Sequence, residues 1–365
     1  MDKLKEARKN IDAIDEQMAK LFEQRMKQAE IVAEYKKELG LPLVNETREK
    51  EVIAENSSYI ADDKIREYYV NFIKETMNLS KDYQAYLNEG MKVAYSGIEG
   101  AFAHLASKRL FPFAKLVAFP SFAKAYEAVE KGECDVAVLP IENSFAGDVG
   151  AVMDLTFQGT LYINQILDYE IDQNLVAKPG TKLSDVKSVI SHPQALNQCA
   201  EFLSSHNFKT IEADNTARAA RAVSDNEDYS VAAIASRESA KLYGLEVVEK
   251  DINSNRNNTT RFGVFSRSLN KSKSIDKVGE HFILNFTCLN EAGSLAKTLN
   301  IIGSHGFNMR NLRSRPMKEL MWNYYFYVEL DGSINTPDGE DMLTELKAVC
   351  DRLKLVGVYY NHKDK

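Results

Sequence analysis

The first 90 residues contain almost nothing that interrupts a helix, and this feature constrains the fold of the chain more than any other. They hold one proline, Pro42, and two glycines, Gly40 and Gly90. Apolar residues recur every three or four positions, at Leu4, Ala7, Ile11, Ile14, Met18 and Leu21. This spacing predicts an amphipathic helix that ends at Gly40 and Pro42. Such a helix is about 55 Å long, too long to bury its stripe within one small domain, so we expect it to pair with the same helix of a second subunit.

Polar side chains then fall on the apolar seam of this helix. Arg25 and Gln28 continue the spacing of the stripe, and Lys36 follows Arg25 on the same face, about 20° past three full turns. A cation on a buried seam needs an anionic partner or a polar cavity. The residues alone leave two alternatives open, a bundle with a few salt bridges at its seam or a binding site for an anion. Two further helices are predicted, one starting near Asn45 and one over 65–87.

Residues 91–268 change to the pattern of an α/β fold. The β-rich runs KVAYS, KLVAF and DVAVLPIE alternate with the helical runs AFAHLASKRLF and FAKAYEAVEKG. This alternation predicts a parallel sheet, and the segment is long enough for two lobes with a cleft between them. Polar turns at 97–100, 141–144 and 192–194 follow predicted strands and open helices, which is where ligands bind in open α/β sheets. Each turn taken singly is an ordinary loop.

The polar stretch 269–277 predicts a linker before a third domain. Beyond it the predicted elements follow the order β-α-β-β-α-β, with helices at about 293–305 and 338–354. This is the ferredoxin-like α+β unit of small-molecule-binding domains. We therefore predict a multidomain chain with domains at 1–90, 91–268 and 278–365.

Composition excludes several classes of protein. The formal charge is 46 − 53 = −7, which argues against a nucleic-acid binder held by net charge. No apolar run reaches the ~18 residues of a membrane span, and the first residues lack the apolar core of a signal peptide. The cysteines, Cys134, Cys199, Cys288 and Cys350, are too far apart for a zinc motif and suit free thiols in the cytoplasm. We expect no metal and no cofactor, since the fingerprints of nicotinamide and nucleoside-triphosphate sites are missing.

The polar residues of the helical segment form an ordered motif. The run ARKNIDAIDEQMAKLFEQR is followed by Lys36, by N-x-x-R-E from Asn45 and by S-x-x-x-Q from Ser80. This motif resembles the all-α chorismate mutase family. The resemblance implies an intertwined dimer in which each site takes Arg8 from the partner and Arg25, Lys36, Arg48, Glu49, Ser80 and Gln84 from its own chain. Lys36 and Gln84 would bracket the ether oxygen on which negative charge develops as chorismate rearranges to prephenate.

Four motifs of the α/β segment occur in a fixed order, YSGIEGAFAHLAS, PIENSFAG, SHPQAL and NNTTRFGVF. Together they resemble the prephenate dehydratase family, which implies two lobes like those of a periplasmic binding protein, with the site in the cleft. Prephenate must lose its ring hydroxyl as water and its ring carboxylate as carbon dioxide, so the site needs a proton donor and cations or amides. Within this resemblance, we expect Thr260 to contact the departing hydroxyl. Arg261 either binds a carboxylate or forms a salt bridge at the start of its strand. The expected lining residues are Glu142, Asn143, Ser144, Ser191 and Gln194. His192, which precedes a proline, is either an acid or structural.

Two short motifs of the C-terminal segment are Gly293-Ser294-Leu295 and Ser314-Arg315-Pro316. With Asn308, they resemble the ligand site of ACT regulatory domains, which in dehydratases bind phenylalanine between paired subunits. These residues are therefore the expected regulatory positions. Arg313 stands where that family usually has glutamate, which reverses a charge near the expected effector site.

The three resemblances describe two successive reactions and the control of both by their end product. We predict a bifunctional cytoplasmic enzyme that converts chorismate to prephenate and then to phenylpyruvate. Inhibition by phenylalanine and assembly as a homodimer or a tetramer are expected. An amino-acid-binding sensor is the alternative, but it leaves the cationic seam unexplained. A mutase fused to a prephenate dehydrogenase disagrees with the missing nicotinamide fingerprint, and arogenate stays open as a substrate in place of prephenate.

Overall fold

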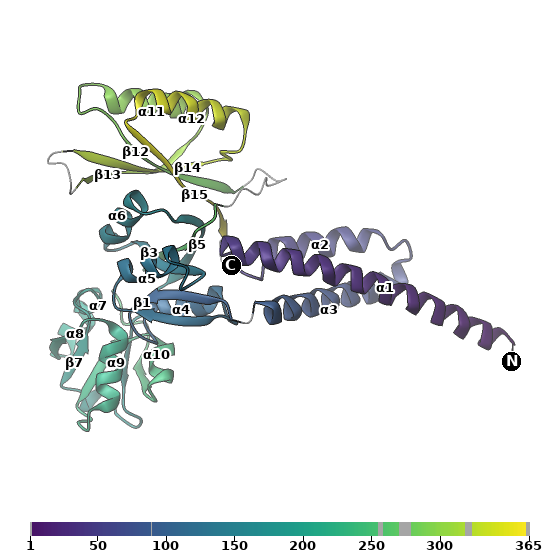
Figure 1. Cartoon of the computed structure of the whole chain (residues 1–365). Helices are drawn as coiled ribbons and strands as arrows, with labels where there is room; N and C mark the ends of the chain where they lie inside the picture. Colours follow the sequence, from purple (N-terminus) through teal and green to yellow (C-terminus); the bar gives the residue numbers. More distant parts are fainter. Residues whose placement is uncertain (1, 89, 255–257, 270–278, 318–322, 363–365) are drawn as a thin grey trace. The chain divides into compact units, whose positions relative to one another are not determined.

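The computed structural model describes residues 2–88, 90–254, 258–269, 279–317 and 323–362. The chain divides into two compact units, Met1–Met91 and Lys92–Lys365 (Figure 1). Apart from Leu269, the predicted linker at 269–277 lies outside the described residues.

Three helices form the first unit, α1 (Asp2–Leu39), α2 (Glu46–Ser58) and α3 (Asp63–Leu87). α1 ends where the sequence predicts, because Gly40 takes a left-handed φ of 64° that other residues avoid. Asn45 caps α2, since its side chain accepts a hydrogen bond from the Arg48 backbone N–H at 3.0 Å. The all-helical prediction for this segment is confirmed.

α3 packs against both α1 and α2 through a partly polar face. Its buried residues are Ile73, Thr76, Ser80, Gln84 and Ala85. The first half of α1 takes little part in this packing, since every residue from 3 to 24 is exposed. Within a single chain, the apolar stripe of that half is therefore bare, with Leu4 59% and Leu21 62% exposed.

The second unit begins with an α/β layer that we call the first lobe. Its elements are β1 (Lys92–Ser96), α4 (Phe102–Leu110), β2 (Lys115–Phe119), α5 (Phe122–Glu130), β3 (Val136–Asn143), β4 (Gly147–Asp148), α6 (Gly150–Gln158), β5 (Tyr162–Glu170) and β11 (Thr259–Ser266). β1 pairs in parallel with β2 and β3, as predicted. The sheet is mixed beyond these parallel strands, because β11 runs antiparallel between β3 and β5.

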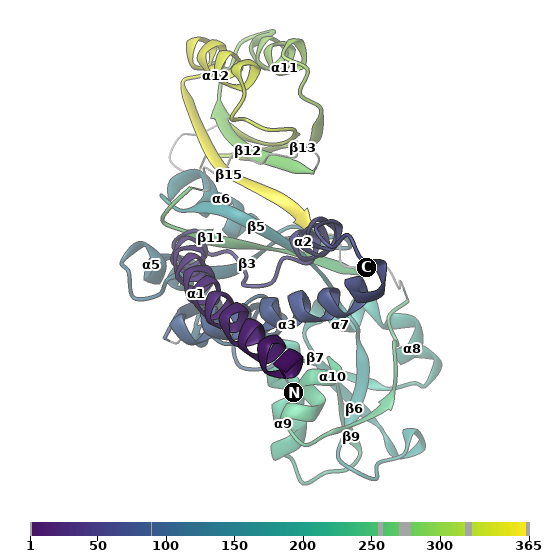
Figure 2. The same cartoon turned by 90° about the vertical axis from the view of Figure 1, so that its right-hand side faces the viewer.

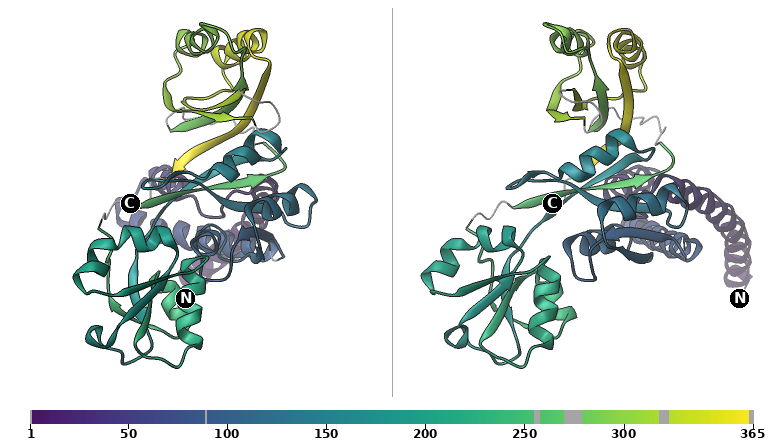
Figure 3. Two further views of the ribbon diagram at one scale, coloured as in Figure 1. Left: turned by 90° about the vertical axis from the view of Figure 1, so that its left-hand side faces the viewer. Right: turned by 60° about the vertical axis from the view of Figure 1, so that its left-hand side comes forward.

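A smaller layer, the second lobe, follows β5 along the chain. Its elements are β6 (Asn174–Ala177), the 3-10 helix η1 (Leu183–Asp185), β7 (Ser188–Ser191), α7 (Pro193–Gln198), α8 (Ala200–Ser205), β8 (Lys209–Glu212), α9 (Thr216–Asp225), β9 (Val231–Ala235), α10 (Arg237–Leu242) and β10 (Glu246–Glu249). The sheet order is β10-β6-β9-β7-β8. Residues of α7 and α8 cover one face and residues of α9 and α10 the other (Figure 3). The chain crosses between the lobes twice, from β5 to β6 and from β10 back to β11.

Residues 279–362 form a third layer, which we call the C-terminal region. Its elements are β12 (Glu280–Thr287), α11 (Ser294–Ser304), β13 (Met309–Pro316), β14 (Tyr324–Asp331), α12 (Pro337–Val349) and β15 (Arg352–His362). The strands take the order β13-β14-β12-β15, and α11 and α12 lie together on one face, as in a ferredoxin-like unit (Figure 1). α12 ends at Val349, before the predicted residue 354, because β15 begins at Arg352.

β15 joins the C-terminal region to the first lobe. It pairs antiparallel with β12 and parallel with β5, where Gly357 lies opposite Ile163. The larger sheet therefore runs unbroken as β13-β14-β12-β15-β5-β11-β3-β1-β2, with β4 on β3 (Figure 2). Glycine is needed at this crossing, because a Cβ on Gly357 would lie 2.0 Å from the carbonyl oxygen of Ile163. One apolar core includes Ile163 and Ile166 of the first lobe and Ile283 and Tyr327 of the C-terminal region.

β3 continues as a strand through residues 141–143 of the predicted turn at 141–144, and the chain turns only at Ser144. Glu142 lies opposite Arg261 and Asn143 opposite Thr260 on the neighbouring strand. The next helix, α6, starts only at Gly150. The neighbouring strand β11 explains the difference, since it gives the backbone of β3 the hydrogen-bond partners that a strand requires.

Candidate active sites

In the first unit, Arg25 of α1 reaches α3. Its guanidinium donates to Ser80 Oγ and, at 3.4 Å, to the carbonyl oxygen of Thr76. Ser80 is buried and donates in turn to Thr76 O at 2.9 Å. These partners are neutral, and burial lowers the pKa of Arg25. A bound anion would reverse that shift, because it favours the charged form.

Lys36 and Gln84 are further polar groups in the interior of the first unit. The Lys36 ammonium donates to the carbonyl oxygen of Leu43 at 2.5 Å. Burial lowers the pKa of Lys36, while the charge of Glu49 acts in the opposite direction. Gln84 is 7% exposed, and among the described residues its buried Oε1 has no hydrogen-bond partner. Buried polar atoms left in this state suit a polar ligand. We call Arg25, Lys36, Ser80 and Gln84 the seam cluster.

The other residues predicted for this site, Glu49, Arg48 and Arg8, are not part of the seam cluster. Glu49 forms an ion pair with Lys81 of α3 at 3.0 Å. Arg48 is largely exposed and pairs with Glu51 at 3.2 Å. Arg8 lies on the exposed half of α1, about 26 Å along the helix axis from Arg25, the nearest member of the seam cluster on α1. A single chain therefore does not bring Arg8 to the seam cluster.

In the second unit, Thr260 and Asn143 meet across β11 and β3. Asn143 Nδ2 donates to Thr260 Oγ1 at 2.9 Å and to Asn258 Oδ1 at 2.8 Å. Asn143 Oδ1 accepts from Gln194 Nε2 at 3.3 Å, which links the first lobe to α7 of the second. Because Thr260 Oγ1 accepts the bond from Asn143, its own hydrogen is available to donate to another group.

Three amides that the sequence analysis missed extend this contact. Asn258 Nδ2 and Gln173 Nε2 both donate to Gln198 Oε1, at 2.9 and 3.3 Å. All three residues are buried. The signal was present, since Gln198 lies one helical turn after Gln194 and Asn258 stands within the motif that contains Thr260. We call Asn143, Gln173, Gln194, Gln198, Asn258 and Thr260 the amide cluster.

A cleft of about 230 Å³ opens beside the amide cluster. Phe145 of the first lobe lies on one side of it, and Gln198 and Glu201 of the second lobe on the other. Ser254 and Asn258, from the segment that returns to β11, complete the wall. Two members of the amide cluster, Gln198 and Asn258, therefore line a cleft between the lobes.

Three other predicted residues contact the backbone. Ser144 Oγ accepts from the N–H of Thr259 at 3.0 Å. Ser191 is fully buried and donates to the carbonyl oxygen of Ile234 at 2.8 Å. His192 Nδ1 accepts from the N–H of Gln194 at 3.2 Å and so caps α7, which is the structural alternative for this histidine.

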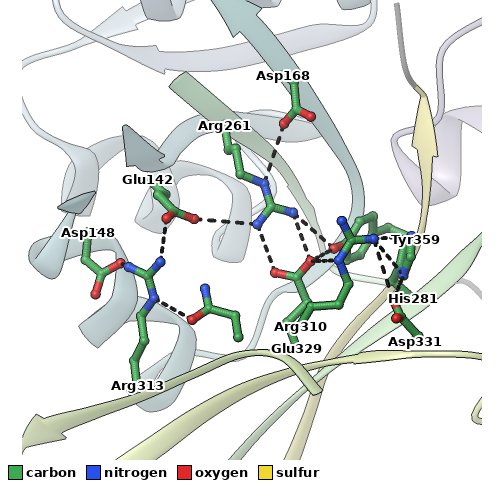
Figure 4. Close-up of polar contacts among 11 residues, drawn as sticks. Glu142, Asp148, Asp168, Arg261, His281, Arg310, Arg313, Glu329, Asp331 and Tyr359 are labelled. Atoms are coloured by element: carbon green, nitrogen blue, oxygen red, sulfur yellow. Dashed lines mark hydrogen bonds and ion pairs between the residues drawn. The ribbon is translucent and has the colours of Figure 1, made fainter. Parts of the chain in front are cut away.

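Glu142 and Arg261 lie on the opposite face of β3 and β11 from Thr260. Arg261 donates two parallel hydrogen bonds to Glu329 of β14, at 2.9 and 3.0 Å (Figure 4). It is also 3.6 Å from Glu142 and 3.5 Å from Asp168. Glu142 was predicted to line the cleft, and Arg261 to bind a substrate carboxylate or to form a salt bridge. The alternation of side chains along a strand turns both toward the C-terminal region instead.

Glu329 is the most buried carboxylate of this network, at 1% exposed. It accepts from the Tyr359 hydroxyl and lies 3.8 Å from Arg310. Burial alone raises the pKa of Glu329, but the hydrogen bonds and charge of Arg261 outweigh it, so the pKa falls below its usual range. Burial likewise lowers the pKa of Arg261, and Glu329 more than offsets this. Each group stays charged because the other is there.

Arg313, the departure from the ACT motif, contacts two carboxylates of the first lobe. It forms ion pairs with Glu142 and Asp148 (Figure 4). Its Nε also donates to Asn311 Oδ1 at 2.9 Å. The reversed charge at this position is therefore neutralised by the first lobe.

The residues expected to bind an effector lie at the start of α11 and along β13. They are Gly293, Ser294 and Leu295 beside or in the first turn of α11, Asn308 before β13, and Ser314, Arg315 and Pro316 at the end of β13. Gly293 takes a left-handed φ of 87° directly before the helix. Asn308 donates to Asp331 at 2.8 Å, and Arg315 donates to Asp154 of α6 at 2.9 Å.

Two family models match the chain, "Chorismate mutase type II" over residues 7–85 and "Prephenate dehydratase" over residues 93–270. The bifunctional chorismate mutase/prephenate dehydratase of Aquifex aeolicus (strain VF5) is 30% identical, and the match covers 98% of each chain. This chain belongs to the bifunctional chorismate mutase/prephenate dehydratase family. It has both activities, and they serve phenylalanine biosynthesis. The two predicted activities are confirmed, and the sensor and dehydrogenase alternatives are set aside.

Two further relatives of this bifunctional enzyme cover its second unit. Arogenate dehydratase/prephenate dehydratase 1 of Arabidopsis thaliana is 31% identical over 74% of this chain and 72% of its own length. The prephenate dehydratase of Arthrobacter aurescens, whose crystal structure contains L-Phe, is 28% identical and superposes with a TM-score of 0.68. That match covers 74% of this chain and 90% of the Arthrobacter chain.

The described part of the bifunctional enzyme holds neither a membrane-spanning helix nor a cluster of metal ligands. None of the described helices is both long and apolar enough to cross a membrane. Within the same ranges, His, Cys, Asp and Glu side chains form no group of three or more that could hold a metal ion.

Proposed function

We propose that the seam cluster is the chorismate site of the mutase. Arg25 binds a substrate carboxylate through its planar fork, and Lys36 and Gln84 stabilise charge that develops on the ether oxygen. The observation that carries this assignment is Arg25, a half-buried cation whose hydrogen bonds to α3 go to the neutral Ser80 Oγ and Thr76 O. The rearrangement needs no acid, base or nucleophile, so positioning and charge stabilisation are the whole of the task.

A second copy of the chain completes this site. Arg48 and Glu49 come from the same chain as the seam cluster, whereas the partner subunit's Arg8 closes the site from across a dimer. The bare apolar stripe on the first half of α1 supports this pairing, because a partner helix would cover it. The free cysteines suit a reducing compartment such as the cytoplasm.

The amide cluster is the prephenate site. Thr260 donates its proton to the ring hydroxyl, which departs as water when the C–O bond breaks, while the C–C bond to the ring carboxylate breaks and its electron pair enters the ring. Solvent returns the proton to Thr260. The bond from Asn143 Nδ2 to Thr260 Oγ1 carries this assignment, since it directs the threonine hydrogen away from β3. Gln194 and the other amides bind the carboxylates, and Glu142, Ser144, Ser191 and Arg261 support the site from around it.

Phenylalanine acts as a feedback inhibitor at the start of α11 and the end of β13. Support comes from the L-Phe found in the related Arthrobacter structure. Arg313 is compatible with this role, because its charge is already paired with Glu142 and Asp148.

The test is a time course of the purified protein with chorismate alone, following prephenate and phenylpyruvate with and without phenylalanine. Arg25→Ala should abolish mutase activity and spare the dehydration of supplied prephenate. Thr260→Val should stop the reaction at prephenate. Equal loss of both activities from either variant, on folded protein, contradicts separate sites. If the wild type accumulates prephenate, arogenate is the next substrate to assay.

A further inference from the structure

The two strands that carry the proposed dehydratase site also carry the ion-pair network on their other face. Thr260 lies opposite Asn143, and the next pair along the strands is Arg261 opposite Glu142. The hydrogen bond between Asn143 and Thr260, at 2.9 Å, and the ion pair between Glu142 and Arg261, at 3.6 Å, therefore lie back to back. A shift of the Arg261 side chain acts on the peptide that joins it to Thr260.

Glu329 makes the shortest contacts of Arg261 with any carboxylate in the described network. Its two oxygens accept from the two terminal nitrogens of Arg261 at 2.9 and 3.0 Å, whereas Glu142 and Asp168 are 3.6 and 3.5 Å away. A paired, two-bond contact of this kind fixes the plane of the guanidinium as well as its position. Tyr359 adds a third contact, since Arg261 donates to its hydroxyl oxygen at 3.1 Å.

Glu329 comes from a different layer of the molecule than the residues it holds. It lies on β14 of the C-terminal region and is almost completely buried there. A buried carboxylate is held in place by its partners, because it has no hydration to return to. Glu329 therefore acts as a fixed point for the side chain that follows Thr260.

We infer that Glu329 is a positioning residue of the dehydratase, which holds Arg261 and through it the orientation of Thr260. The inference rests on the Thr260 site proposed above. Without a carboxylate at position 329, the only carboxylates of the described network that Arg261 can pair with are Glu142 and Asp168 of its own lobe. It then draws Glu142 away from Arg313, which displaces β3 beside Asn143. The C-terminal region thereby sets the dehydratase rate even when no effector is bound.

The experiment compares Glu329→Gln with Asp331→Asn in the full chain. Asp331 is the matched control, because it lies two residues along β14 on the same face. It contacts Asn308 at 2.8 Å, His281 at 2.9 Å and Arg310 at 3.6 Å, none of which lies on β11. Glu329→Gln should lower the dehydratase kcat by about tenfold or more, as the loss of a charge-assisted pair allows. KM for prephenate should stay within about threefold, since Glu329 does not touch the substrate. Asp331→Asn should leave kcat near that of the wild type, Glu329→Asp should restore part of the loss, and mutase activity should be unchanged in all three.

A double-mutant cycle with Arg261→Lys tests whether Glu329 acts on Thr260 through Arg261. Arg261→Lys keeps the charge but loses the planar fork, so it should lower kcat, and adding Glu329→Gln should lower it little further. The inference is overturned if the kcat losses of the two single variants multiply in the double variant. It is also overturned if Glu329→Gln keeps kcat within twofold of the wild type, or raises KM while kcat is unchanged. If Glu329→Gln does not fold, Glu329→Asp and Arg261→Lys still form the comparison.

Thr260→Val, assayed in parallel, separates the two proposals. If it keeps full kcat, the proposed site itself is wrong. If Thr260→Val abolishes dehydration while Glu329→Gln leaves the dehydratase kcat unchanged, only the positioning role of Glu329 is wrong.

Discussion

Asn143 can be replaced by a carboxylate of the same shape, which reverses the polarity at the centre of the amide cluster. Asn143→Asp removes the hydrogens that bond to Asn258 and Thr260 at 2.8 and 2.9 Å. Two lost hydrogen bonds cost about 2 kcal/mol, and an oxygen facing Asn258 Oδ1 adds about 1–3 kcal/mol. Asn258 cannot relieve this by turning over, because its Nδ2 bonds to Gln198. We expect the second unit to lose about 3–5 kcal/mol of unfolding free energy at pH 8, together with dehydratase activity.

The defect of this variant should shrink as the pH falls. A protonated carboxyl donates one hydrogen bond, so the surrounding acceptors and burial raise the pKa of the new carboxyl in the folded state above its unfolded value. The folded state then binds the proton more tightly, and stability present at low pH is lost as the pH rises through the folded-state pKa. Thermal unfolding curves and dehydratase rates at pH 5 and pH 8 measure the effect.

Asn164→Asp is the matched control for this prediction. Asn164 is 1% exposed, and its amide donates to Ser266 Oγ at 2.6 Å and to the carbonyl oxygen of Ser268 at 2.7 Å. It should lose stability with the same dependence on pH while the folded fraction keeps its dehydratase kcat. The reasoning is refuted if Asn143→Asp is as stable as the wild type at pH 8, or if its defect does not change with pH.

Three further perturbations test other parts of the second unit. Lys354 donates to two carbonyl oxygens at the end of α6, and burial lowers its pKa to about 8. The unfolded state keeps that proton up to about pH 10.4, so wild-type melting temperatures should gain a rising contribution between pH 8 and pH 10 that Lys354→Met lacks. Gly357→Ala should cost about 1–3 kcal/mol by calorimetry, because its Cβ would meet the Ile163 carbonyl at 2.0 Å, and an unchanged melting temperature contradicts the β15–β5 pairing. Arg313→Glu gathers three carboxylates and should lower the melting temperature at low salt, with partial recovery at about 0.5 M salt. A melting temperature that ignores salt would argue against these ion pairs.

Sequence reasoning succeeded where an element's own residues decide its structure. Gly40 ends α1 through its backbone conformation, and Asn45 caps α2 through its own side chain, so both boundaries are readable locally. It failed where pairing with a strand distant in the sequence decides which way a side chain points. Thr260 and Arg261 are neighbours in one motif, yet the pairing of β11 sends their side chains to opposite faces, one toward Asn143 and one toward Glu329. The residues near position 261 do not predict a partner on β14, because that contact depends on the order of strands in the whole sheet.

The order of strands in the larger sheet differs from their order along the chain, and β15 is the clearest case. This strand is the last element of the chain, yet it lies inside the larger sheet between β12 and β5. The joint between the C-terminal region and the first lobe is therefore made of backbone pairing and does not depend on the peptide segment that connects them. A gene divided between residues 269 and 279 should yield two polypeptides that reassemble on co-expression and co-elute in size-exclusion chromatography. Deletion of the final strand alone should instead expose the edges of both layers, so the shorter truncation is the more damaging one.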